Sequence, residues 1–193
     1  MILEGIVTTT NADGSPNVAP MGPRVELEEF ETLLLRPFQT STTYQNLKRE
    51  PFGVFHVVDD ARLLARAAIG CWDKLPETFP AEKIVGFVLS GACRWYEFQV
   101  ESLDDSKARA NVLVRVVHRG HIKDFFGWNR AKHAVLEAAI LATRVFLLSE
   151  AEIKSQIDAL RVIVEKTAGE AECDAFALLE EYVKNHYAEA GQR

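Results

Sequence analysis

The sequence predicts an α+β protein in which an antiparallel β-barrel comes first and a group of helices follows. Residues 3–117 contain short runs rich in β-branched side chains, and turn signals separate these runs. From residue 129 onward, the apolar residues recur at helical spacing instead. A block of strands followed by a block of helices is typical of α+β folds, whereas regular alternation of the two would indicate α/β.

The first two predicted strands form a hairpin at the N-terminus. Residues 3–10 and 15–21 flank Asn11-Ala12-Asp13-Gly14, a tight-turn sequence, so the two runs are expected to pair antiparallel. Pro16 and Pro20 lie near the ends of the second run, where a missing amide is tolerated. Further strands are predicted at residues 32–36, 52–58, 93–103 and 108–117, the last two as a second hairpin.

The predicted helices are short within the first block and longer after it. Short helices are expected at residues 42–49 and 61–70, and a largely buried helix at residues 129–148. Ser149 and Glu152 form a capping box that opens another helix. Gly169 ends that helix, and a last one is expected at residues 172–187. We therefore expect a barrel domain at residues 1–127 and a helical region at residues 128–193 that packs on the barrel or on a partner subunit.

Composition narrows the class of protein. The 193 residues are 48% hydrophobic and 26% charged, as expected of a soluble globular chain, and the net charge of −6 makes nucleic acid an unexpected partner. Three widely spaced cysteines predict neither a disulfide framework nor a metal cluster. Short or interrupted apolar stretches predict no membrane span. An N-terminus without a signal-peptide layout favours the cytoplasm.

A candidate ligand-binding segment is Arg36-Pro37-Phe38-Gln39-Thr40-Ser41-Thr42-Thr43. It connects a predicted strand to a predicted helix start, and it contains four consecutive hydroxyl residues after an arginine. Hydroxyls and the free amides of a helix start can hold a phosphate. A single Ser or Thr in this place would more simply be a helix cap, but four exceed what a cap needs.

Several strings in the chain resemble the FMN-binding split-barrel superfamily, and most closely an uncharacterised prokaryotic flavoprotein branch of it. The strings lie at residues 4–9, 14–22, 40–47, 52–60 and 127–144. The resemblance implies a six-stranded barrel and a homodimer, with one FMN at each side of the interface. It does not supply a substrate.

The resemblance also implies which residues hold FMN. The phosphate would lie at the helix start after the third strand, and the isoalloxazine ring along the second strand and the loop after it. Small residues there would let a planar ring approach the backbone amides. The residues expected at the cofactor are Asn17, Ala19, Pro20, Met21, Gly22, Arg36, Thr40, Ser41, Thr42, Thr43 and Asn46.

A second cationic segment opens the helix near residue 130. Arg130, Lys132 and His133 lie where the helix dipole already disfavours cations. One interpretation adds Arg130 and Lys132 to the cofactor-binding set, as a clamp on the flavin phosphate or on an anionic substrate. The other is a solvated helix end that contacts an acidic surface of a partner subunit.

Three functions remain open from the sequence. The protein is either a flavin-dependent oxidoreductase acting on a small redox substrate, a flavin carrier or sensor without turnover, or a structural homodimer that has lost its cofactor. The intact hydroxyl cluster argues against the third. No GxGxxG motif occurs, so a nicotinamide would bind at the flavin without a domain of its own.

Overall fold

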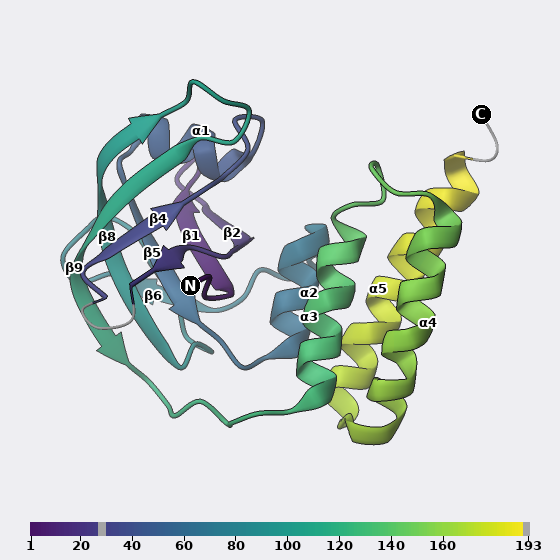
Figure 1. The fold of residues 1–193 in the computed structure, drawn as a ribbon. Coiled ribbons are helices and arrows are strands. Elements are labelled where there is room, and N and C mark those ends of the chain that lie inside the picture. The colour runs from purple at the N-terminus through teal and green to yellow at the C-terminus, as the bar shows by residue number, and fades with distance from the viewer. Residues whose placement is uncertain (27–29, 191–193) are drawn as a thin grey trace. The chain divides into compact units, whose positions relative to one another are not determined.

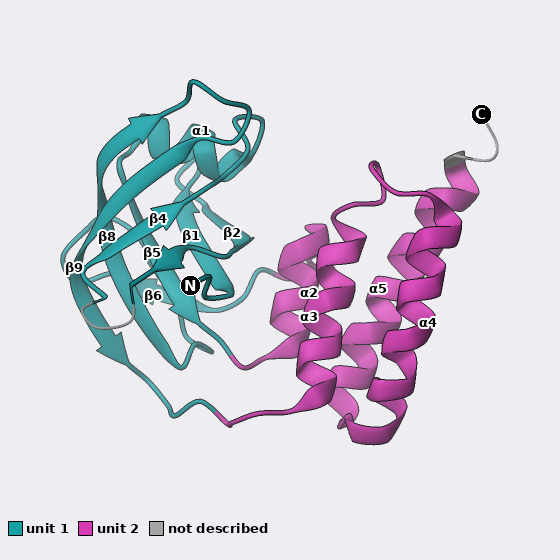
Figure 2. Cartoon of the chain, viewed as in Figure 1, with its two compact units in different colours: residues 1–58, 75–125 teal, residues 59–74, 126–193 magenta. Residues whose placement is uncertain are grey.

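The computed structural model describes residues 1–26 and 30–190. Within them the chain forms two compact units (Figure 2). Unit 1 comprises residues 1–58 and 75–125, and unit 2 comprises residues 59–74 and 126–193. The chain therefore leaves the first unit once, returns to it, and leaves it again.

Unit 1 is built on a curled antiparallel sheet (Figure 1). Among the described residues, seven strands lie in the order β2-β1-β5-β8-β9-β4-β3. Their bounds are β1 Gly5–Thr10, β2 Pro16–Met21, β3 Arg24–Val25, β4 Thr32–Leu35, β5 Phe52–Val57, β8 Arg94–Asp104 and β9 Asn111–His121. The two predicted hairpins, β1–β2 and β8–β9, are both present.

The N-terminal residues bring the two edges of this sheet together. Only Gly22 and Pro23 separate β2 from β3, the strands at opposite edges. Leu3 N donates to Pro23 O at 3.1 Å and Val25 N to Met1 O at 2.9 Å, so residues 1–3 pair with β3 just before they enter β1. The expected barrel-like α+β fold is confirmed. Its sheet has seven strands rather than six, because the two-residue β3 is too short to leave a sequence pattern.

The barrel interior contains one large apolar cluster, and a helix covers one end of the barrel. Phe55, Phe98, Leu33 and Leu35 are fully buried there. Helix α1, Thr42–Arg49, adds Tyr44 and Leu47 to the same cluster. The long β8–β9 hairpin contains two register shifts, which bend and twist a strand pair and so allow it to wrap around the core.

A segment that the sequence pattern missed packs on this sheet. The strap, as we call residues 75–90, contains the two-stranded sheet β6 Thr78–Pro80 and β7 Phe87–Leu89. Val88 and Phe79 pack with Val54 of β5 and Trp95 of β8. The strap strands have three residues each, below the length at which alternation can be recognised.

Two buried polar side chains of the sheet, Thr8 and Glu97, hold the strap. Thr8 Oγ1 donates to Phe87 O at 2.5 Å. Glu97 accepts from the amides of Glu82 and Lys83 at 2.8 and 2.7 Å and from Trp95 Nε1 at 3.2 Å. The indole of Trp95 lies over Gly120, where a Cβ would come within 2.1 Å of the ring, so the strand partner must be glycine.

Unit 2 is a bundle of four helices within the described range. They are α2 Ala61–Ile69, α3 Arg130–Ala142, α4 Glu150–Thr167 and α5 Glu170–Ala190. Their alanine-rich faces share one core with Ile153, Phe176 and Leu179. The predicted capping box of Ser149 and Glu152 is present, and Asp60 Oδ1 caps α2 by accepting from Leu63 N.

Helix α3 ends six residues before the predicted end at residue 148. Residues 143–147 form turns, although apolar residues continue at helical spacing. Tyr187 of α5 donates its hydroxyl toward the carbonyls of Val145 and Leu148, at 3.2 and 2.9 Å. Phe146 and Leu147 are exposed, so their apolar character reflects something other than burial in this core.

The compact units differ from the expected division at residue 127 in one segment. Residues 59–74, which include α2, belong to the helical unit although they precede the strap in sequence. Ala61 and Ala65 are buried in the helical core, and Arg62 of α2 pairs with Asp174 of α5. Within the described ranges, no helix is both long and apolar enough for a bilayer crossing.

Candidate functional site

The predicted phosphate segment lies between β4 and α1. Ser41 is the N-cap of α1: its Oγ accepts from Tyr44 N at 3.2 Å and donates to Phe38 O at 2.7 Å. One of the four hydroxyls is therefore committed to capping. Thr40 and Thr42, on either side of the cap, are exposed. The first amides of α1 have no partner inside the helix, so this end still offers donors.

Arg36 is the feature of this segment that the fold itself does not explain. In the described part of the chain, its Nε is a buried side-chain nitrogen without a hydrogen-bond partner. A buried donor that is left unsatisfied costs about 1–3 kcal/mol, and a charged one costs more. Native structures generally avoid this cost, so this nitrogen is expected to take an acceptor from outside the described residues, either a water or an anion. An anion at this position would supply it.

Three other predicted residues meet in one polar network inside the barrel. Asn17 Nδ2 donates to Thr9 Oγ1 at 3.1 Å and to Thr43 Oγ1 at 3.2 Å. Asn46 Nδ2 donates to the same Thr9 hydroxyl and to Asn11 Oδ1, both at 3.0 Å. Thr43 and Asn46 are only 2–3% exposed. Their side chains therefore hold α1 against β1 and β2 rather than facing outward as the hydroxyls of Thr40 and Thr42 do.

The sequence did not single out Thr9 and Asn11, which complete this network. Thr9 lies on β1 opposite Asn17, and its position in the register puts both side chains on the same face of the sheet. Asn11 was considered only as a turn residue. The predicted hairpin paired these two strands without fixing which residues face each other, so it did not single out Thr9 or Asn11.

The open edge of β2 has few amide donors. Asn11 N donates to Ser15 O, which makes these two residues a hydrogen-bonded pair. Hydrogen-bonded and non-hydrogen-bonded pairs alternate along an antiparallel ladder, so the backbone groups of Asn17, Ala19 and Met21 bond to β1. Pro16, Val18 and Pro20 then direct their backbone outward. Prolines lack the N–H, so within β2 the outward donor is the amide of Val18. The prolines also protect this edge from pairing with another strand.

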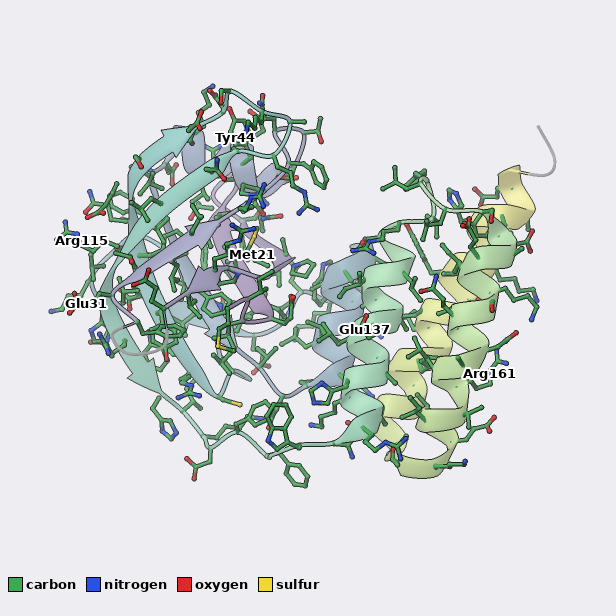
Figure 3. All side chains as sticks on the ribbon, in the orientation of Figure 1. Met21, Glu31, Tyr44, Arg115, Glu137 and Arg161 are labelled. Atoms are coloured by element: carbon green, nitrogen blue, oxygen red, sulfur yellow. The ribbon has the colours of Figure 1, made fainter. Side chains whose placement is uncertain are left out.

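Gly22 follows β2 and is crowded by its own chain. A Cβ there would lie 2.7 Å from Ile2 Cγ2 and 2.9 Å from both carboxylate oxygens of Glu4. A larger residue here would therefore displace the side chains of Ile2 and Glu4. Met21, the preceding residue, lies on β2 (Figure 3) and packs at the margin of the barrel core.

The second predicted cationic segment has partners within unit 2. Lys132 Nζ donates to the carbonyl of Asp59 and lies 3.8 Å from Glu172 Oε1 and 5.4 Å from the centroid of the Phe126 ring. Asn129 caps α3 by accepting from Lys132 N at 2.9 Å. Arg130 is exposed. The negative group expected to compensate Lys132 is thus supplied by Glu172 of the same chain.

Comparison with family models and solved structures places these observations in context. Residues 3–123 match the model described as "Protein of unknown function (DUF447) N-terminal domain", and residues 129–181 match "Protein of unknown function (DUF447)". The FMN-bound protein MM1853 from Methanosarcina mazei is 29% identical to this chain, and the match covers 94% of this chain and 94% of that one, with a TM-score of 0.82. No curated protein matches the sequence.

More distant structures share the fold alone. The 2-nitrobenzoate 2-nitroreductase NbaA of Pseudomonas fluorescens is 18% identical and covers 61% of this chain and 64% of its own, with a TM-score of 0.52. The FMN-binding protein of Thermus thermophilus is 12% identical and covers 62% and 70%, with a TM-score of 0.52. The resemblance to FMN-binding barrels is confirmed at the level of the fold, and the chain belongs to the DUF447 family.

Proposed function

We propose that this protein binds FMN and is a flavin-dependent oxidoreductase. The observation that carries the cofactor is the buried Arg36 Nε without an acceptor, next to a helix start flanked by exposed threonine hydroxyls. A phosphomonoester dianion is the acceptor that suits an arginine and several hydroxyls together. The FMN-bound relative from Methanosarcina mazei, which aligns over nearly the whole chain, supports the same assignment.

The described contacts suggest two roles for the residues of the phosphate site, contact with the phosphate and support of α1. Arg36, Thr40 and Thr42 would contact the phosphate, together with the cap residue Ser41 and the first amides of α1. Thr43, Asn46 and Asn17 would hold α1 in place from inside the barrel.

The flavin ring would lie along the open edge of β2. There the backbone of Ala19, Pro20, Met21 and Gly22 is expected to border it, and the Val18 amide offers the outward donor. Bound FMN would supply the electron-transfer chemistry that protein side chains lack.

We further propose that two copies of the chain form a homodimer. Four large apolar side chains of unit 2 are 77–89% exposed: Phe126, Trp128, Phe146 and Leu147. Exposed apolar groups of this size favour an interface, and twofold dimers are the commonest assemblies. Light scattering of the FMN-loaded protein at micromolar concentration should return twice the mass of the chain, and a monomer mass would contradict the dimer.

The cofactor proposal is tested by comparing FMN with riboflavin, which lacks the phosphate. Fluorescence titration should show clearly tighter binding of FMN, and equal affinities would contradict the phosphate site. Changing Ser41 and Thr42 together to Ala should weaken FMN by about 1–3 kcal/mol through lost bonds to a charged group. Ser149→Ala is the matched control, because it removes an N-cap serine of unit 2 and should cost about 1 kcal/mol of stability without changing FMN affinity.

Turnover is a separate test from binding. The FMN-loaded protein is mixed anaerobically with NADH or NADPH, and bleaching of the flavin absorption over seconds to minutes supports an oxidoreductase. Stable yellow protein with both donors, at an intact FMN affinity, would instead favour a carrier or sensor.

A further inference from the structure

The tip of the β8–β9 hairpin, residues 104–110, runs alongside residues 37–39 of the candidate phosphate segment. Ala110 N donates to Pro37 O at 3.0 Å, and Gln39 N donates to Ala108 O at 3.1 Å. Phe38 forms an antiparallel bridge with Arg109, whose guanidinium carbon lies 4.3 Å from the centroid of the Phe38 ring. Figure 1 shows the hairpin tip beside α1. The loop that leads from Arg36 to the helix is thus held by backbone bonds to a distant part of the chain.

Side chains extend this contact to the helix itself. Tyr44 OH donates to Asp105 Oδ2 at 2.6 Å, and Lys48 Nζ lies 3.1 Å from the same oxygen. Gln39 Nε2 donates to the carbonyls of Asp105 and Lys107 at 2.6 and 2.8 Å. Asp105 therefore contacts the loop before α1, its first turn and its last turn.

The ring of Tyr44 is anchored in the barrel core, so the hydrogen bond to Asp105 connects the hairpin tip to that core. Tyr44 is 3% exposed and belongs to the barrel core, and only its hydroxyl reaches the hairpin tip (Tyr44 is labelled in Figure 3). The hydrogen bond from Tyr44, and then the contact with Lys48, lower the pKa of Asp105 below its usual value. The carboxylate is therefore ionised at neutral pH, and the bond to Tyr44 is of the stronger, charge-assisted kind.

Tyr44 also connects to the capping residue. Its backbone N–H is the group that Ser41 Oγ accepts from, at 3.2 Å. A continuous chain of contacts thus runs from Asp105 to the Tyr44 hydroxyl, through the Tyr44 residue, and on to Ser41. Rotation of the first turn of α1 would break this chain, so the chain sets the orientation of the helix amides and of the Thr42 hydroxyl.

We propose that Asp105 is a positioning residue for phosphate recognition and acts through Tyr44. The inference rests on the proposed function, because it assumes that the α1 start holds the FMN phosphate. Preorganised donors bind an anion more tightly than donors that must first be ordered. The contacts of the tip described above go to residues 37–48 and not to β2, so its influence should be limited to the phosphate and should not extend to the flavin ring.

The test measures FMN and riboflavin affinities in parallel for four variants. Tyr44→Phe keeps the buried ring and removes the hydroxyl, and Asp105→Ala removes the acceptor. Each should weaken FMN by roughly tenfold, the effect of losing one charge-assisted bond, while riboflavin affinity stays within about twofold. Asp105→Asn retains an oxygen acceptor without the charge, so it should lose less FMN affinity than Asp105→Ala. Glu101→Gln, which removes the exposed ion pair with Arg115 on the same hairpin, should leave both affinities unchanged.

Thermal melting shows whether each variant is folded. If Asp105→Ala is unfolded, the FMN and riboflavin affinities of Tyr44→Phe decide whether the proposal holds. An unchanged ratio of FMN to riboflavin affinity in Tyr44→Phe, with a wild type that prefers FMN, overturns this inference and leaves the proposed function intact. Where the ratio is unchanged because both affinities fall equally, the tip supports the barrel as a whole rather than the phosphate site. A wild type that binds both ligands equally overturns the phosphate site and this inference together.

Discussion

The α1 start and the strap are both attached to the same sheet by polar side chains, but they differ in how completely those side chains are paired. At the strap, His56 is fully buried, with Nδ1 donating to Ile6 O at 3.2 Å and Nε2 accepting from Leu89 N at 3.1 Å. Glu97 accepts three N–H groups nearby. At the α1 start, Arg36 Nε has no acceptor within the described residues.

The difference separates structural polar groups from candidate binding groups. When all the hydrogen-bond partners of a buried group come from its own chain, folding alone satisfies that group. A buried donor without a partner is a cost that the fold alone does not recover. By this criterion the polar groups of the strap are structural, whereas the segment before α1 contains one buried donor, Arg36 Nε, whose partner the described residues do not supply.

The α3 start belongs with the strap under the same criterion. Lys132 contacts the Asp59 carbonyl, Glu172 and the ring of Phe126, all within unit 2. The cofactor-binding role assigned to Arg130 and Lys132 from sequence stays a prediction. The described contacts of Lys132 favour a role in stability, and the three tests that follow probe this contrast from its largest expected effect to its smallest.

Acid should weaken the strap through His56. Burial lowers the pKa of His56 from 6.5 to about 3, so between these values the unfolded chain binds a proton that the folded chain does not. The free energy of unfolding should therefore fall as pH decreases below 6.5, by about 3 kcal/mol at pH 4, where the pH lies roughly 2.5 units below the unfolded pKa. Urea unfolding at a series of pH values measures it.

His56→Gln should unfold more easily and lose this part of the pH dependence. His121→Gln is the matched control, because His121 is exposed and should leave the wild-type slope intact. If His56→Gln kept the full pH dependence of the free energy of unfolding, the strap would not depend on a neutral His56. The strap would then no longer serve as the fully paired site in the comparison with the α1 start.

Arg36→Met should separate affinity from stability at the α1 start. Loss of a charged donor to phosphate is expected to weaken FMN by about 1.5–3 kcal/mol, or roughly tenfold to more than a hundredfold. The melting temperature of the FMN-free protein should be unchanged or slightly raised, because an unsatisfied buried donor is removed.

Fluorescence titration and thermal melting of the same preparations provide both numbers. Arg109→Met, which removes the neighbouring exposed cation over Phe38, should weaken FMN much less. A variant at Arg36 that lost stability but kept its FMN affinity would move Arg36 into the same class as the strap residues.

Lys132→Gln should show the opposite behaviour. Glu172 is 7% exposed, and removal of its cationic neighbour should lower the free energy of unfolding by about 1–2 kcal/mol. FMN affinity should remain within about twofold. Denaturant unfolding and FMN titration check the two expectations, with Arg130→Gln at the exposed neighbouring position as a variant that should change neither. Reduced FMN affinity with unchanged stability would restore the cofactor role of Lys132.

Signals contained in a few neighbouring residues were sufficient for most of the secondary structure. The turn at residues 11–14, the caps at Asp60 and Ser149, and the alternation in the β8–β9 hairpin each depend on local spacing, and the structure contains all of them. The class of fold followed from their order. The apolar pattern extended α3 too far, because Val145 continues the helical spacing and is buried in the core of unit 2 although residues 143–147 form turns.

The pairing of side chains depended on the tertiary structure instead. The residues that decide the roles at the candidate site are far apart in the chain: Tyr44 and Asp105 are separated by 61 positions, Lys132 and Asp59 by 73. Whether a charged group has a partner is a property of the folded surroundings, since local spacing carries no record of which distant carbonyl or carboxylate will come within 3 Å. The sequence could therefore locate Arg36 and Lys132 as two cations near helix starts. Only folding distinguished Arg36, whose Nε has no acceptor among the described residues, from Lys132, whose partners are already present.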